Sequence, residues 1–165
     1  MIKMAETNIK QEYEKLKKKY KDLPSFEELD HEFELSSLDI KGVGKDFMSR
    51  AIRRRIADRV TFYTRILEAV LLPPSNPSPI SIREFNSVSN ERRNELMEVY
   101  NKLMDSERYN LQLNLDTDEK RDVEYIKLIS KKIKDTKLEV LSLAGDMRKA
   151  WSQNDQEEDD GGYFS

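Results

Sequence analysis

KDFMSRAIRRRIADRVTFYTRILEAVLL, the stretch from Lys45 to Leu72, indicates the fold more clearly than any other part of the chain. Its apolar residues recur at steps of four and three, which places them on one face of an α-helix; they are Ile52, Ile56, Val60, Tyr63, Leu67 and Val70. At 1.5 Å per residue, such a helix would be about 40 Å long. We therefore expect a mainly α-helical bundle built around one long central helix.

The segment before this helix shows the same periodicity. Ile9, Tyr13, Leu16 and Tyr20 predict an amphipathic helix over residues 6–21, with lysines on its other face. Pro24 ends this helix, because proline interrupts helical hydrogen bonding. Ser25 and Glu28 then have the spacing of a capping box, which predicts a short acidic helix beginning near Phe26.

Four prolines end the central helix, and we expect an extended connection there: Pro73, Pro74, Pro77 and Pro79. Short alternating patterns at 80–85 and 111–115 predict a small two-stranded β ribbon. Between them, Ser87 or Ser89 caps a helix that carries Leu96, Val99, Tyr100 and Leu103.

Two further helices are predicted towards the C-terminus. Thr117 or Asp118 opens the first, whose apolar residues are Val123, Ile126, Ile129 and Ile133. A separate final helix spans about Thr136 to Trp151. Residues 1–151 then form a single helical domain, and residues 152–165 a tail.

The tail contains neither a basic nor an aliphatic residue, and its five acids are Asp155, Glu157, Glu158, Asp159 and Asp160. We expect it to be disordered, because like charges repel and nothing can be buried to offset the loss of chain entropy. It can compete with DNA for a basic groove, or it can offer Tyr163 and Phe164 as an anchor for a partner. A third interpretation is a solubilising tail without a specific partner.

Charge is sorted along the rest of the chain. The whole sequence has 29 basic and 32 acidic residues, so the 27 acids left outside the tail give residues 1–151 a net charge of +2. Residues 23–39 hold six acids and no Lys or Arg, whereas an arginine-rich face is expected on the central helix: Arg50, Arg53, Arg54, Arg55, Arg59 and Arg65. These arginines can bind phosphates, the acidic 23–39 segment or an acidic partner. The low net charge favours the internal or protein-binding role.

The sequence lacks the parts of most enzymatic sites, and its 32 acidic residues give many chance carboxylate pairs that do not point to a site. There is no Cys, and the only His is His31, so we expect no nucleophilic triad and no metal site. Gly42-Val43-Gly44-Lys45 lacks the Ser or Thr of a phosphate loop and resembles a helix-hairpin-helix turn only in part. No apolar run is long enough to span a bilayer. We expect a non-enzymatic, cytoplasmic protein without cofactor or small-molecule substrate.

The layout of the chain resembles a known family. Its features are the lysine-rich start Lys15-Leu16-Lys17-Lys18-Lys19, the helical segment 51–56 and the acidic run 157–160. Together they resemble the larger of the small accessory subunits of the crenarchaeal replicative family-B DNA polymerase holoenzyme. The resemblance implies a subunit that binds the polymerase catalytic subunit through its helical body, touches DNA only weakly or indirectly, and limits strand displacement through its acidic tail.

Two other functions are compatible with the sequence. One is a nucleic-acid- or ribosome-associated module that uses the arginine-rich helix and the lysine-rich N-terminal helix. The other is a scaffold that assembles replication or transcription proteins.

Overall fold

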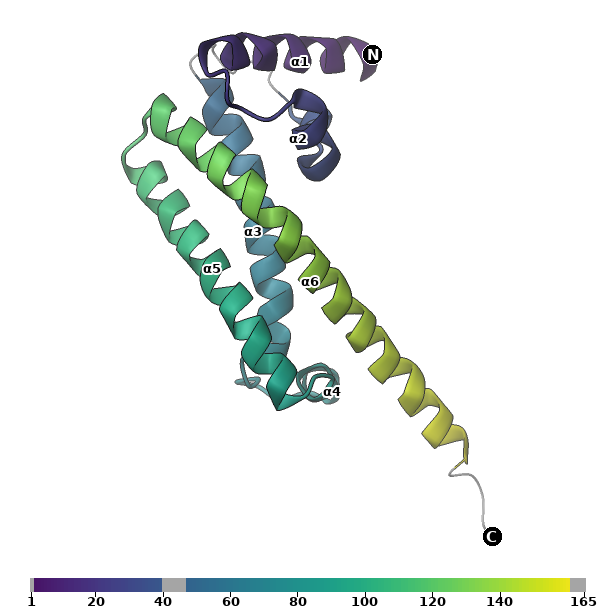
Figure 1. The fold of residues 1–165 in the computed structure, drawn as a ribbon. Helices are drawn as coiled ribbons and strands as arrows, with labels where there is room; N and C mark the ends of the chain where they lie inside the picture. The colour runs from purple at the N-terminus through teal and green to yellow at the C-terminus, as the bar shows by residue number, and fades with distance from the viewer. Residues whose placement is uncertain (1, 40–46, 161–165) are drawn as a thin grey trace. The chain divides into compact units, whose positions relative to one another are not determined.

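The computed structural model describes the backbone of residues 2–39 and 47–160, with the side chains of residues 9–39 and 47–153. These residues form six α-helices and one 3-10 helix and include no β-strand, which confirms the mainly α fold. In chain order they are α1 (Ile2–Lys19), α2 (Phe26–Phe33), η1 (Leu35–Ser37), α3 (Met48–Leu71), α4 (Pro79–Asn86), α5 (Asn90–Leu115) and α6 (Glu119–Asp160), as Figure 1 shows.

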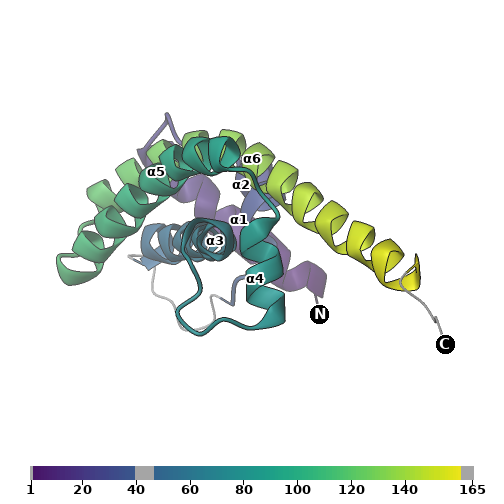
Figure 2. The ribbon, with the colours of Figure 1, turned by 90° about the horizontal axis from the view of Figure 1, so that it is seen from below.

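The chain divides into two compact units, where the sequence predicts one helical domain over residues 1–151. Unit 1 comprises Met1–Thr61 and Met104–Lys134, and unit 2 comprises Phe62–Leu103 and Asp135–Ser165. The three long helices α3, α5 and α6 each contribute to both units; Figure 2 shows α3 almost along its axis.

The apolar stripe of α3 is buried as predicted. Ile52, Ile56, Val60, Tyr63, Leu67 and Val70 are each at most 5% exposed. α3 packs with α5 and α6, as expected for a bundle. In unit 1 the rings of Tyr109 on α5 and Tyr125 on α6 lie 5.5 Å apart. In unit 2 the Tyr100 hydroxyl on α5 donates a hydrogen bond to Glu68 on α3 at 3.1 Å. α3 is therefore the central element that its sequence predicts.

The predicted β ribbon is wrong, because both of its segments are helical. Ser78 caps α4 in a reciprocal arrangement with Ser81, and Pro79 occupies the first turn, where its missing N–H costs nothing. Residues 111–115 form the last turn of α5, in which Leu113 is fully buried while Leu111 and Leu115 remain exposed. Their alternation therefore belongs to the end of an amphipathic helix.

α6 is one continuous helix, which corrects the prediction of two. No proline or glycine interrupts residues 134–137, and Ile133, Thr136, Val140 and Leu143 continue the buried stripe at helical spacing. The sequence predicts a disordered tail from residue 152, but the structure places residues 152–160 in α6. Polar residues can extend an existing helix, because propagation needs no new nucleus. Residues 161–165 of the tail lie outside the described residues.

The predicted helix starts are confirmed elsewhere. Ser25 and Glu28 form a complete capping box at the start of α2. The Ser89 hydroxyl accepts from the backbone N–H of Arg92 at the start of α5, and Asp118 accepts from Lys120 at the start of α6. No helix of the described residues is long and apolar enough to cross a membrane.

Candidate interaction surfaces

The acidic turn around His31 does not form a metal site within the described residues. His31 is exposed. The carboxylate of Asp30 accepts hydrogen bonds from the backbone N–H of Ser36 at 2.6 Å and from its hydroxyl at 2.7 Å. Asp30 therefore ties α2 to η1 and has a structural role. The Gly42–Lys45 turn lies outside the described residues.

Arg53 is the clearest correction to the predicted arginine-rich face, because its side chain is fully buried. Its Nε lies 2.6 Å from Oδ1 of Asp122 on α6, a close ion pair without the alignment of a hydrogen bond. Its two terminal nitrogens donate to the side chains of Asn110 and Asn114 on α5, the latter at 2.9 Å. We call these four residues the buried arginine cluster. It joins α3, α5 and α6 within unit 1.

Burial and the neighbouring positive charge shift the pKa of Asp122 in opposite directions; this residue is 2% exposed. Burial raises the pKa of its carboxyl, and the guanidinium of Arg53 partly offsets this effect. Burial likewise raises the pKa of the nearby Tyr125 hydroxyl. Removal of Arg53 would leave a buried carboxylate without its counter-ion, so the cluster makes Arg53 a structural residue.

The other five arginines of the predicted face lie in three different environments. Arg55 donates from Nε to the Phe33 carbonyl oxygen at 2.8 Å, and both Arg55 and Arg59 form ion pairs with Glu34. These contacts match the interpretation that the arginines pair with the acidic 23–39 segment. Arg50 stacks on the ring of Phe47 at 4.8 Å. Only Arg54 and Arg65 of the six are classed as exposed. The α3 arginines therefore do not form one continuous basic surface.

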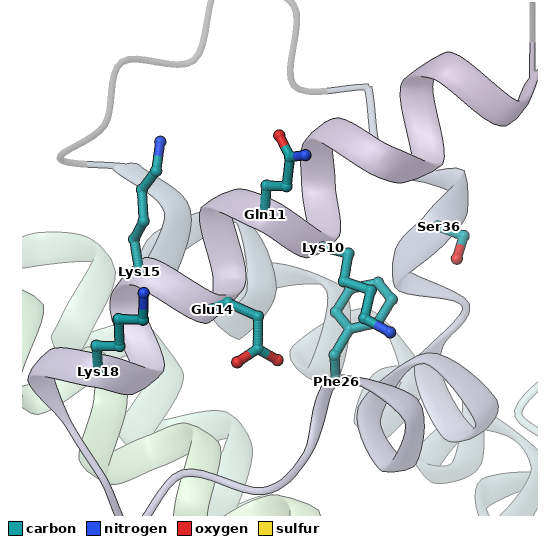
Figure 3. Close-up of a pocket in the computed structure, with 7 residues that line it drawn as sticks. All are labelled: Lys10, Gln11, Glu14, Lys15, Lys18, Phe26 and Ser36. Atoms are coloured by element: carbon teal, nitrogen blue, oxygen red, sulfur yellow. The ribbon is translucent and has the colours of Figure 1, made fainter.

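A groove in unit 1 is lined largely by α1, including three of its lysines (Figure 3). It has a volume of about 690 Å³. α1 supplies five of its seven lining residues, and α2 and η1 supply one each: Lys10, Gln11, Glu14, Lys15, Lys18, Phe26 and Ser36. We call it the lysine groove. The lining residues that the structure describes carry three positive charges and one negative charge.

The groove is held in place by the packing of α1 on α2. The Tyr13 hydroxyl donates to the Pro24 carbonyl oxygen at 2.6 Å, and the Tyr13 and Phe26 rings lie 5.8 Å apart. The Lys10 ammonium group pairs with Glu27 and lies 6.0 Å from the centre of the Phe26 ring. This pairing raises the pKa of Lys10.

Large apolar side chains are exposed on α4 and α6 in unit 2, in addition to Phe62 on α3. Leu138 and Leu141 on α6 are 66% and 58% exposed, and Ile80 and Ile82 on α4 are 59% and 45% exposed. The Arg83 guanidinium on α4 stacks over Trp151 on α6 at 4.2 Å. Leu138 and Leu141 are three residues apart and therefore share one face of α6. These residues are candidates for contact with a protein partner.

The predicted acidic tail begins within α6. Residues 155–160, which we call the acidic segment, end the helix, while Tyr163 and Phe164 lie outside the described residues. The sequence of this last stretch of α6 contains Asp155, Glu157, Glu158, Asp159 and Asp160, and negative charge is disfavoured at the C-terminal end of a helix. A cationic partner would relieve this unfavourable interaction.

Sequence reasoning did not identify two of these features. The lysines of α1 were recognisable as a polar face, but the groove depends on the positions of Phe26 and Ser36. The partners of Arg53 are distant in sequence; Asn110 and Asn114, four residues apart on α5, are the only local signal. No protein-family model, curated protein or solved structure matches the chain, so its residues and their geometry are the basis for assigning a role.

Proposed function

We propose that this protein is a non-catalytic accessory subunit of a DNA polymerase. It binds the catalytic subunit through the exposed apolar residues of unit 2, and it holds the acidic segment near the polymerase, where this segment competes with DNA and limits strand displacement. The resemblance of the chain to crenarchaeal polymerase accessory subunits supports this proposal.

The observation that carries the proposal is the length of α6 beyond its buried stripe. Leu143 is the last buried residue of α6 among those with described side chains, yet the helix continues to Asp160. After Leu143 no residue of α6 with a described side chain is buried, and Trp151, which contacts Arg83, remains partly exposed. A protein partner that covers this part of α6 and faces its acidic end with basic groups would stabilise the segment.

The exposed leucines of α6 supply the apolar part of such a contact. Large exposed apolar patches often mark protein-binding sites, and the two leucines would contribute to such a patch. Complete burial of one Leu contributes about 1.5–3 kcal/mol, and both leucines retain more than half of their exposure. Burying the two residues would therefore contribute on the order of 2 kcal/mol or more, which is over tenfold in affinity.

Binding to the replicative family-B polymerase of the same organism tests the proposal. Leu138→Ser with Leu141→Ser should raise the Kd about tenfold or more in biolayer interferometry with immobilised polymerase. The matched control is Leu111→Ser with Leu115→Ser, because these exposed leucines share a face of α5 in unit 1. The control should leave Kd unchanged. Absence of binding by the wild-type protein, or equal loss in both variants, would contradict the proposal.

A further inference from the structure

We infer that the lysine groove of unit 1 binds the phosphate backbone of a nucleic acid. This site is separate from the unit 2 residues proposed to contact the polymerase. The inference does not depend on that partner, since the groove is a property of the chain itself. It assigns direct nucleic-acid contact to the folded body.

The positions of the lysines suit a linear polyanion better than a single compact anion. Lys10, Lys15 and Lys18 follow one another along α1, and the first and last are about 12 Å apart along the helix axis at 1.5 Å per residue. One strand of B-form DNA carries a phosphate per 3.4 Å of helix axis, so this length equals the axial rise of about three or four phosphates. The groove is open to solvent, with Lys10 and Lys15 52% and 59% exposed.

The three ammonium groups are available to a phosphate at little cost. Lys18 has no ion-pair partner among the residues whose side chains the structure describes. Lys10 pairs with Glu27 and Lys15 with Glu12, but both contacts are exposed to solvent. Exposed ion pairs contribute little to stability, so phosphate oxygens can replace these carboxylates.

The lining predicts binding without sequence preference. Lysines contact phosphates as point charges and do not read base edges. Phe26 is 6% exposed and packs against Tyr13, so its ring does not offer a stacking platform for a base. Affinity should therefore come from charge and fall steeply with salt.

A purely structural role for the lysines makes a different prediction. Lys18 lies in the last turn of α1, where a positive charge stabilises the helix dipole, and Lys10 links α1 to α2. If these were their only roles, their replacement would lower stability without a specific effect on ligand binding. The salt dependence of binding separates the two explanations.

The test uses the full chain and a fluorescein-labelled oligothymidylate in anisotropy titrations across a salt series. Lys10→Gln, Lys15→Gln and Lys18→Gln are combined in one variant. The matched control combines Lys120→Gln, Lys132→Gln and Lys149→Gln, which removes the same charge from exposed positions outside the groove. Glu14→Gln, which removes the carboxylate of the groove lining, is the third variant.

The groove variant should bind at least tenfold more weakly at low salt. Its slope of log K against log salt should be shallower by about 2, since each lost contact to a single strand accounts for about 0.7. The control should retain most of the affinity, and Glu14→Gln should bind more tightly. Equal losses in the groove and control variants, or no binding by the wild-type chain, would overturn the inference. Equal competition by polyglutamate at the same charge concentration would also overturn it, because the groove would then recognise acidic protein segments.

Discussion

Replacement of Arg53 by Met should destabilise unit 1 strongly, because Arg53 is the only cation in the buried arginine cluster. Its side chain is fully buried, its Nε lies 2.6 Å from Asp122, and Asp122 is itself 2% exposed. Breaking a buried ion pair by removing one partner costs about 3–5 kcal/mol. The free energy of unfolding, measured by urea denaturation with circular dichroism, should fall by this amount.

A double variant isolates the electrostatic part of this loss. Arg53→Met with Asp122→Leu removes both charges and keeps similar volumes, and such replacements are often neutral or stabilising. The amides of Asn110 and Asn114 can turn to solvent, since neither residue is buried. The double variant should therefore recover most of the loss, about 3 kcal/mol relative to the single variant.

The same reasoning fixes the pH dependence of the single variant. Burial raises the pKa of Asp122 above its ordinary value of 3.8, and removal of Arg53 raises it further. Above that raised value, the native state carries a buried charge that the unfolded state solvates freely. Because the folded state holds the proton more tightly, the penalty should shrink as the pH falls towards 3.8.

Arg54→Met is the matched control, because Arg54 is exposed on the same helix and should change stability by less than about 0.5 kcal/mol. An Arg53→Met variant as stable as this control would refute the reasoning. So would a double variant whose loss equals the sum of the two single losses.

Three other predictions concern the core, a connection and acid stability. Ile56→Asp should abolish cooperative melting in circular dichroism, because it places an unpaired charge at a fully buried position of α3; a folded variant would contradict this assignment. Arg93→Met should increase the mobility of residues 72–89, because Arg93 donates hydrogen bonds to the carbonyl oxygens of Val70 and Phe85 at 2.8 and 2.7 Å. Limited proteolysis should cut this segment faster in the variant than in the wild type, and equal rates would contradict the prediction. Hydrogen bonds from Lys19 and Tyr20 lower the pKa of Glu119 below 4.5, so the stability that ionised Glu119 contributes is present above that pH and is lost on acidification. Glu119→Gln should therefore weaken the rise of the unfolding free energy with pH in this range. An unchanged pH profile of stability would contradict this role.

The predictions from sequence succeeded where residues close together in the sequence determine the structure. The α3 stripe from Ile52 to Val70 repeats at the helical period, and the Ser25–Glu28 capping box depends on residues three positions apart. The ribbon prediction failed because a short alternating run is also compatible with a helix. At 80–85 the Ser78 cap and Pro79 decide in favour of α4.

The interaction surfaces were less predictable, because they depend on contacts between distant segments. Helical spacing places Arg53 beside the buried stripe, but its ion-pair partner Asp122 is contributed by α6 and has no signal near Arg53 in the sequence. The lysine groove similarly needs α2 and η1 beside α1. The acidic segment was evident from composition, but its helical backbone was not, since the preceding turns of α6 propagate into it.

Strand-displacement synthesis by the family-B polymerase, with and without this protein, tests the proposed function most directly. The wild-type protein should shorten displacement products. A variant whose five acids are replaced by Asn or Gln should still bind the polymerase and yield longer products: Asp155→Asn, Glu157→Gln, Glu158→Gln, Asp159→Asn and Asp160→Asn. Tyr163→Ala with Phe164→Ala should have a smaller effect, because tethering lets weak electrostatic competition act at high effective concentration. Products of the same length with and without the wild-type protein would contradict the account.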